Sequence, residues 1–266
     1  MLAFDRKTHI LQILQEESSV SVPALAARLT VSEVTVRKTL NSLARQGLLR
    51  RTRGGAVNIA VAARENDLHT KAKTNTRQKK DIARKAYECI SDNETIYIDA
   101  GTTTLELVRL MRSGNKRNVS VVTNALNIAV ELIDVPDLEV VLTGGKLRHG
   151  VVSCVGPLAT ASVASLVFDK AFIGANHITL EHGPTTPDLN EAEIKRSAVA
   201  SSITSYLLCD SSKFGGVSMT KIAPLDSFTA IITDGEISQE FRATFSKADV
   251  NLIIAESRMG RMDSRL

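Results

Sequence analysis

Residues 95–104 read Thr-Ile-Tyr-Ile-Asp-Ala-Gly-Thr-Thr-Thr, and this stretch decides the fold class of the larger part of the chain. The β-branched and aromatic residues of Thr95–Asp99 predict a strand, and a helix is predicted from about Thr103 to Met111. Gly101 stands at the junction, where a residue without Cβ lets the backbone approach a ligand closely. A strand that runs straight into a helix is typical of α/β proteins.

The same alternation of strand and helix recurs along residues 77–255. Further strands are predicted at Val119–Thr123, Glu139–Thr143, Ala171–Gly174, Tyr206–Asp210, Ala230–Asp234 and Asn251–Ala255. Alternation over this length predicts a doubly wound, mainly parallel sheet in a single α/β domain. In such sheets, ligands bind beyond the carboxyl ends of the strands.

Polar and glycine residues follow four of the predicted strands. They are Asp99, Gly101, Thr102, Thr103 and Thr104; Thr123 and Asn124; Gly144, Gly145 and Lys146; and Asp210 with Lys213. Hydroxyl groups, free amides at a helix start and lysines suit a phosphate group. Because these segments meet at one edge of the sheet, they predict a site for a phosphorylated ligand. The alternative is that the threonines only cap helices.

A helix that opens at Asn190 adds two further candidates for this site. Glu191 and Lys195 are four residues apart and therefore share a helix face. The alternative is a surface ion pair. Gly144-Gly145-Lys146 is not a nucleotide-binding P-loop, because Val140 stands where that motif requires its first glycine.

Residues 1–57 predict a winged helix-turn-helix domain. Apolar spacing predicts a first helix over residues 6–15, Ser21 caps a second helix, and Ser32 caps a third that ends near Arg45. Residues 48–57 predict a β-hairpin wing with glycines at its turn.

The third helix of this N-terminal domain, which we call the head, is predicted to read DNA. Val36, Leu40 and Leu43 form its buried stripe, which leaves an apolar Val34 among polar residues on the other side. An exposed valine beside basic residues suits the major groove, where it contacts a thymine methyl group. The alternative is a winged helix used only for protein contacts. The candidate DNA-binding residues are Ser32, Glu33, Val34, Thr35, Arg37, Lys38 and Asn41, with Arg50, Arg51 and Arg53 of the wing on phosphates.

Charge is distributed unevenly along the chain. Residues 1–85 hold 17 Lys and Arg against 7 Asp and Glu, a balance of +10, whereas residues 86–266 hold 16 against 22, a balance of −6. This layout predicts that only the N-terminal head meets a polyanion. Residues 58–76 are predicted to be a linker, and residues 256–266 a frayed tail.

Other classes of protein are disfavoured by composition. Three separated cysteines and five scattered histidines form no metal or disulfide pattern, so we expect reduced thiols and neither metal nor cofactor. No apolar run reaches the roughly 18 residues that a membrane span needs. We therefore expect a cytoplasmic protein that does not contact a membrane.

The residues in both parts resemble the DeoR family of bacterial transcriptional regulators. The head carries the resemblance in residues 24–40, 47–51 and 54–56, although Lys38 and Thr39 stand where that family usually has Arg and Asp. Six motifs continue it through the α/β domain: Asp99-Ala-Gly-Thr-Thr, Val122-Thr-Asn, Thr143-Gly-Gly, Phe168-Asp-Lys-Ala-Phe-Ile-Gly, Asn190-Glu-Ala-Glu-Ile-Lys-Arg and Asp210-Ser-Ser-Lys-Phe-Gly.

This resemblance implies a fold related to ribose-5-phosphate isomerase and CoA transferases, a sugar-phosphate effector, and repression that the effector relieves. Because one winged helix contacts only a short site, we also expect a homo-oligomer on repeated half-sites of double-stranded DNA. Two hypotheses compete with a ligand-controlled repressor. One is a sugar-phosphate isomerase with Glu191 or Asp99 as general base, and the other is a constitutive DNA-architectural protein.

Overall fold

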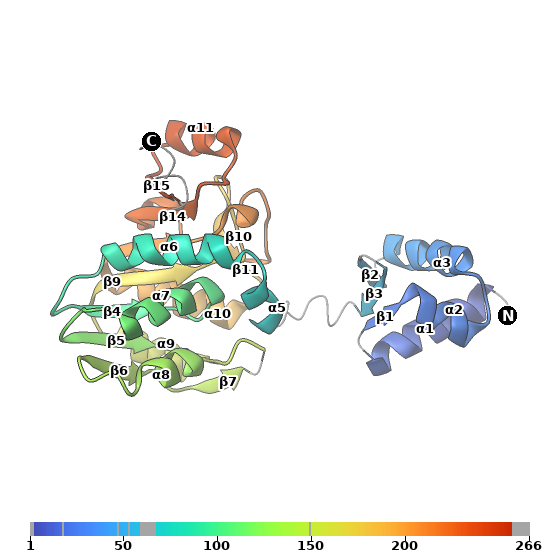
Figure 1. Cartoon of the computed structure of the whole chain (residues 1–266), viewed down its shortest axis with the longest axis horizontal. Coiled ribbons are helices and arrows are strands. Elements are labelled where there is room, and N and C mark those ends of the chain that lie inside the picture. Colours follow the sequence, from blue (N-terminus) through green and yellow to red (C-terminus); the bar gives the residue numbers. More distant parts are fainter. Residues whose placement is uncertain are drawn as a thin grey trace, which may run out of the picture. The chain divides into compact units, whose positions relative to one another are not determined.

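The computed structural model describes residues 3–17, 19–46, 48–52, 54–58, 68–148 and 150–256. It divides the chain into two compact units, Met1–Asp67 and Leu68–Leu266, whose elements are labelled in Figure 1. The predicted contact residue Arg53, the first part of the predicted linker and nearly all of the predicted tail lie outside the described residues.

The N-terminal unit is a small helical domain with a three-stranded antiparallel sheet of order β1-β3-β2. Its elements are α1 (Ala3–Glu17), β1 (Ser19–Ser21), α2 (Val22–Leu29), α3 (Glu33–Arg45), β2 (Leu49–Thr52) and β3 (Gly55–Asn58). Both predicted caps are confirmed: Ser21 Oγ accepts from the amide of Ala24 at 3.2 Å, and Ser32 Oγ from that of Thr35 at 3.3 Å. The strand β1 was not predicted, because three residues carry too little pattern to indicate a strand.

The C-terminal unit is built on a seven-stranded sheet of order β15-β14-β12-β9-β4-β5-β6. All neighbouring strands are parallel, which confirms the predicted sheet. The strands are β4 (Thr95–Ile98), β5 (Val119–Thr123), β6 (Leu138–Leu142), β9 (Phe168–Gly174), β12 (Ser202–Leu208), β14 (Ala230–Asp234) and β15 (Leu252–Ala255).

Helices cover both faces of this sheet. One hydrophobic cluster joins Ile96 and Ile98 of β4 to α6 (Thr76–Glu88), α7 (Thr102–Ser113) and α8 (Leu126–Leu132). A second cluster joins the intervening Tyr97 to α9 (Pro157–Ala164), α10 (Leu189–Ala200) and α11 (Gln239–Lys247). The alternation along β4 follows from the two-residue period of a strand, and it makes the domain a three-layer sandwich.

Short elements connect the strands and helices of this unit. They are the hairpin β7 (Lys146–Arg148) with β8 (Ser153–Val155), the small sheet β10 (His177–Thr179), β11 (Gly183–Thr186) and β13 (Thr220–Lys221), and the 3-10 turns η1 (Ser211–Lys213) and η2 (Leu225–Ser227).

The prediction of a linker up to residue 76 is wrong for residues 68–76. They form the helix α5 (Leu68–Lys73) and its turn into α6, and they belong to the C-terminal unit. The buried ammonium group of Lys79 holds this turn, because it donates to the carbonyl of Lys71 at 2.6 Å and to that of Thr74. The polar composition of this segment hid the helix, since its anchor is made through backbone carbonyl groups rather than apolar side chains.

Candidate DNA-binding surface and candidate ligand site

The exposed face of α3 matches the face predicted from its spacing. Val36, Leu40 and Leu43 are at most 1% exposed, whereas Val34 is 61% exposed. The remaining predicted contact residues of this helix are exposed or, for Thr35, half-buried: Ser32, Glu33, Arg37, Lys38 and Asn41. Contact of this face with DNA stays a prediction.

Two side chains of α3, Arg37 and Thr39, make polar contacts within the N-terminal unit. Arg37 Nη2 lies 3.1 Å from Glu33 Oε2 in an exposed ion pair. Thr39 is buried, accepts from Arg6 Nε at 3.0 Å and donates to the carbonyl of Thr35 at 2.9 Å. Thr39 therefore fixes α1 against α3, and its departure from the family pattern leaves the exposed face unchanged.

Of the three wing arginines, the structure describes the side chain of Arg51. Arg51 is half-buried, and its Nη1 donates to the carbonyl of Gly55 at 2.5 Å across the hairpin. This contact closes the wing, so the prediction that Arg51 is aimed at phosphate is not supported. The side chain of Arg50 and all of Arg53 lie outside the described residues.

The sheet order reverses between β4 and β9, and a buried ion pair lies at this switch point. Asp99 follows β4 and accepts from the amide of Gly174 at 2.9 Å and from Lys195 Nζ. Lys195 also donates to the carbonyl of Gly174 at 3.1 Å. Asp99 and Lys195 are 1% and 4% exposed. The crevice at a topological switch point is where α/β sheets bind ligands.

A second ion pair, between the buried Glu191 and the half-buried Arg148, lies beside the first. Glu191 accepts from Arg148 Nη1 of β7 and, at 3.0 Å, from the hydroxyl of Thr186. Asp188 caps α10, because its Oδ1 accepts from the amide of Glu191 at 3.0 Å. Its Oδ2 lies 3.7 Å from Arg148 Nη2. Both Glu191 and Lys195 are buried and have other ion-pair partners, so the alternative of a surface ion pair between them is wrong. That they bind a ligand at this edge stays a prediction.

Burial shifts the pKa values of the titratable groups around Asp99. Loss of solvent raises the pKa of Asp99, and the charge and hydrogen bond of Lys195 oppose that rise. Burial also raises the pKa of Tyr97 well above its ordinary range, with Asp99 adding to the effect. It raises the pKa of the Cys209 thiol to about 12. Tyr97 and Cys209 therefore remain neutral at physiological pH.

The start of α7 offers backbone amides rather than hydroxyl groups. The Thr104 hydroxyl donates to the carbonyls of Asp99 at 2.7 Å and Gly101 at 3.0 Å, so it is used inside the protein. Gly101 occupies the cap position and supplies no side-chain acceptor. The first-turn amides of residues 102–104 thus begin the helix without a side-chain cap, the arrangement that favours an anion.

Thr123 and Asn124 build the framework instead of presenting free donors. The Thr123 hydroxyl donates to the carbonyl of Ile98 at 2.7 Å and accepts from the amide of Ala125 at 3.0 Å. Asn124 accepts from the hydroxyl of Tyr97 at 3.1 Å and donates to the carbonyl of Cys154 at 3.0 Å. The prediction that Thr104, Thr123 and Asn124 donate to a ligand is therefore not supported, because their polar groups hold strand ends together.

The Gly144-Gly145-Lys146 segment also differs from its predicted role. Both glycines have positive φ, 68° and 112°, and an added Cβ on Gly145 would lie 2.9 Å from that of Ala159. Lys146 is exposed. The cation that does reach the buried site is Arg148, which sequence reasoning missed because no motif marks it.

Asp210 anchors the α5–α6 turn to the end of β12. One carboxylate oxygen, Oδ1, accepts from Asn75 Nδ2 at 2.9 Å, from the amide of Ser212 at 3.1 Å and from the Ser212 hydroxyl. The other oxygen, Oδ2, is buried and has no hydrogen-bond partner among the described residues. Asn75 has a left-handed backbone, φ 50°, and its side chain does not cap α6 because it reaches Asp210.

Lysine charges surround this carboxylate. Burial lowers the pKa of Lys79, the negative charge of Asp210 opposes that shift, and Lys213 adds to it. Burial and the charges of Lys213 and Lys71 likewise lower the pKa of His177. Charges of both signs therefore act at the Asp210 end of the site, and Asn75 and Lys79 are further members that sequence reasoning missed.

The described residues contain no group of three His, Cys, Asp or Glu that could hold a metal ion. Within the same residues, no helix is long and apolar enough to cross a membrane.

The winged-helix unit and the α/β unit with a polar switch point define a helix-turn-helix transcription regulator that carries a second domain. The chain belongs to the DeoR family: residues 6–61 match the DeoR-like helix-turn-helix domain, and residues 74–235 match the DeoR C-terminal sensor domain. The N-terminal unit is therefore a DNA-binding unit, and the C-terminal unit is a sensor unit.

Similar proteins cover nearly the whole chain. HTH-type transcriptional regulator GlpR of Haloferax volcanii is 34% identical over 258 residues, 97% of this chain and 100% of that protein. A putative aga operon transcriptional repressor of Escherichia coli O157:H7 is 34% identical over 252 residues, 94% and 93% of the two chains. The lactose phosphotransferase system repressor of Lactococcus lactis is 32% identical over 243 residues, 91% and 95% of the two chains.

Solved structures show a partial likeness. Ribose 5-phosphate isomerase A of Methanocaldococcus jannaschii gives a TM-score of 0.38 at 14% identity, over 53% of this chain and 55% of that one. The eIF2B delta subunit of Chaetomium thermophilum gives 0.43 at 18% identity, over 60% and 56%. These likenesses add nothing to the assignment of function.

Proposed function

We propose that this DeoR-family regulator is a cytoplasmic repressor of a carbohydrate-utilisation operon, and that a phosphorylated sugar controls it. Relatives named as an aga operon repressor and a lactose phosphotransferase system repressor support the repressor role. The predicted contact residues of α3 read the operator, and a homo-oligomer places two such helices on repeated half-sites.

The observation that carries the effector proposal is the buried charge at the switch point. Asp99 with Lys195 and Glu191 with Arg148 form two ion pairs at this edge of the sheet. Buried ion pairs contribute little net stability compared with apolar residues of similar volume, so a binding role accounts for them better than a structural one.

The parts of a sugar phosphate fit different parts of this edge. The uncapped amides of residues 102–104 and the lysine at position 213 suit the phosphate. The unpartnered Oδ2 of Asp210 suits a sugar hydroxyl, which would supply the missing donor. Asp99 and Glu191 are already held by cations, which favours binding over general-base catalysis and therefore a regulator over an isomerase.

Asp210 also supplies a route from the ligand to the DNA-binding unit. A ligand hydroxyl on Oδ2 would share this carboxylate with Asn75, whose side chain holds Oδ1 and with it the turn between α5 and α6. The helix α5 is the first described element after the DNA-binding unit. Releasing or retaining the α5–α6 turn therefore changes how freely the DNA-binding unit moves relative to the sensor unit.

The effector proposal predicts that one sugar phosphate raises the melting temperature of the full chain and weakens its binding to DNA. The measurement is a thermal-shift panel of pentose and hexose phosphates, with unphosphorylated sugars and inorganic phosphate as controls. The best compound is then added to complexes with a duplex selected in vitro. A panel without any shift contradicts the proposal, and conversion of a sugar phosphate by the protein would establish an isomerase instead.

The variant Asn75→Gly separates ligand binding from the effect of the ligand on DNA binding in the same experiment. Glycine keeps the left-handed backbone and removes the amide that reaches Asp210. The ligand should still raise the melting temperature of this variant. Its effect on DNA binding, a coupling free energy that is typically about 1–3 kcal/mol, should be mostly lost. The matched control is Asn93→Gly, another left-handed asparagine (φ 64°), which should retain both responses. Normal coupling in Asn75→Gly would exclude this route.

Arg37→Ala is expected to weaken binding to the selected duplex by about 1–3 kcal/mol, because a base-reading arginine loses its fork of hydrogen bonds. Binding to mixed-sequence DNA should change much less. Arg28→Ala is the matched control, since Arg28 also pairs with a glutamate, Glu17, on an exposed surface. Equal losses on both duplexes would assign Arg37 to phosphate contact.

A further inference from the structure

The unit boundary changes how the chain's charge is divided. Residues 1–67, which form the DNA-binding unit, carry 10 Lys and Arg against 6 Asp and Glu, a balance of +4. Residues 68–85 carry 7 against 1, a balance of +6. More than half of the +10 counted over residues 1–85 thus belongs to α5 and α6 of the sensor unit.

Much of this charge lies at the surface without compensation. Lys73 of α5 and Arg77 and Lys80 of α6 are exposed, and in the described part of the chain none of the three makes an ion pair. Arg77 and Lys80 are three residues apart and therefore neighbours on one helix face. We call Lys73, Arg77 and Lys80 the α5–α6 basic face.

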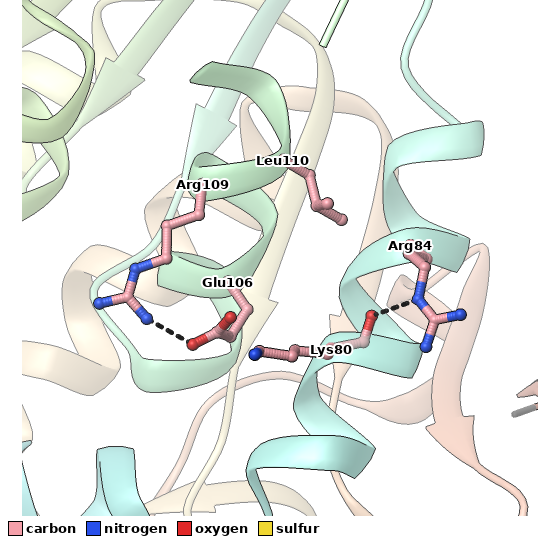
Figure 2. Close-up of a pocket in the computed structure, with 5 residues that line it drawn as sticks. All are labelled: Lys80, Arg84, Glu106, Arg109 and Leu110. Carbon is pink, nitrogen blue, oxygen red and sulfur yellow. Dashed lines mark hydrogen bonds and ion pairs between the residues drawn. The ribbon is translucent and has the colours of Figure 1, made fainter. Parts of the chain in front are cut away.

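A hollow between α6 and α7 extends this face. It has a volume of about 400 Å³ and is lined by Lys80, Arg84, Glu106, Arg109 and Leu110. Figure 2 shows Lys80 and Arg109 on either side of Glu106, and Arg109 Nη1 lies 2.5 Å from Glu106 Oε1. Arg84 is paired with Asp81 and Arg109 with Glu106, so Lys80 is the cation of this lining that has no ion pair among the described residues.

We propose that the α5–α6 basic face is a second DNA contact, made by the sensor unit on phosphates and without sequence preference. The chain itself argues for DNA as the partner. Leu68 follows Asn58, the last described residue of the DNA-binding unit, by ten residues, which span at most about 36 Å. When the DNA-binding unit holds a duplex, phosphates are therefore at high effective concentration around this face.

The test measures salt dependence on full-length protein and does not depend on the effector proposal. The probe is a fluorescent duplex of about 40 base pairs of mixed sequence, titrated between about 50 and 200 mM potassium chloride. Arg77→Gln/Lys80→Gln should lower the slope of log affinity against log salt by about 0.9 for each phosphate that the variant no longer neutralises. Affinity for a selected duplex should fall by the same factor, because these phosphates carry no sequence information.

The matched control is Arg117→Gln/Lys247→Gln, which removes one arginine and one lysine from exposed positions elsewhere on the sensor unit. It should leave the slope unchanged. The proposal is overturned if the two double variants behave alike, since net charge alone would then explain the effect, or if the slope of Arg77→Gln/Lys80→Gln equals that of the wild type. Thermal melting should be equal in all three proteins, because the substituted side chains are exposed.

Discussion

Lys195→Met is expected to destabilise the sensor unit by about 3–5 kcal/mol at neutral pH, because it leaves the carboxylate of Asp99 buried without its cation. All three tyrosines, Tyr87, Tyr97 and Tyr206, lie in this unit, and the chain has no tryptophan. Urea unfolding of the full chain followed by tyrosine fluorescence therefore reports on the sensor unit alone.

The stability that Lys195→Met loses should decrease as pH is lowered. Burial already raises the pKa of Asp99 in the folded protein, and without Lys195 only the hydrogen bond from the Gly174 amide still opposes that rise. The folded variant then binds the Asp99 proton more tightly than the unfolded chain does. Its free energy of unfolding should fall as pH rises through the folded pKa, and its deficit should shrink as pH is lowered.

The double variant Asp99→Asn/Lys195→Met is the control, because it removes both charges and keeps similar volumes. It should be more stable at neutral pH than Lys195→Met alone, and its deficit should be much less sensitive to pH. If the single and double variants lose the same stability at every pH, packing around the lysine stem is the cause and the charge pair is not.

Gly55→Ala is expected to destabilise the DNA-binding unit by about 3 kcal/mol or more and to abolish DNA binding. A Cβ at this position would lie 2.2 Å from the carbonyl oxygen of Val20, and the clash is with backbone that cannot rotate away. Strand β1 must then separate from β3, where Ser21 pairs with Gly55. Hydrogen exchange in α3, together with binding to mixed-sequence DNA, measures the loss.

The neighbouring Gly54→Ala is the matched control. Gly54 has a φ of 94° but no atom within 4 Å of an added Cβ, so only backbone strain opposes the substitution. That strain costs about 1–2 kcal/mol, and the variant should still bind DNA. Similar behaviour of the two variants would show that turn strain, rather than the approach of β1 to β3, makes these glycines necessary.

Local interactions explain which parts of this protein were predictable. The caps Ser21 and Ser32 act on amides three residues away, and the apolar stripe of α3 follows from helical spacing. The alternation of strands and helices likewise indicated the parallel sheet, and the sheet placed Asp99 and Asp210 at its carboxyl edge. The exposed face of α3 was predictable for the same reason, because each residue's side of a helix depends only on its position in the chain.

Partnerships between distant segments were not predictable. Asp99 and Lys195 are 96 residues apart, and Asn75 and Asp210 are 135 apart. Nothing local indicated that Arg148 rather than Lys146 enters the site, or that Thr123 and Asn124 hold the framework. The amino-acid sequence by itself determined the strands of the parallel sheet, the helices of the DNA-binding unit and the edge at which polar groups gather. Only the tertiary structure decided which charges meet there, because the energy of a buried charge depends on the neighbours that folding brings to it.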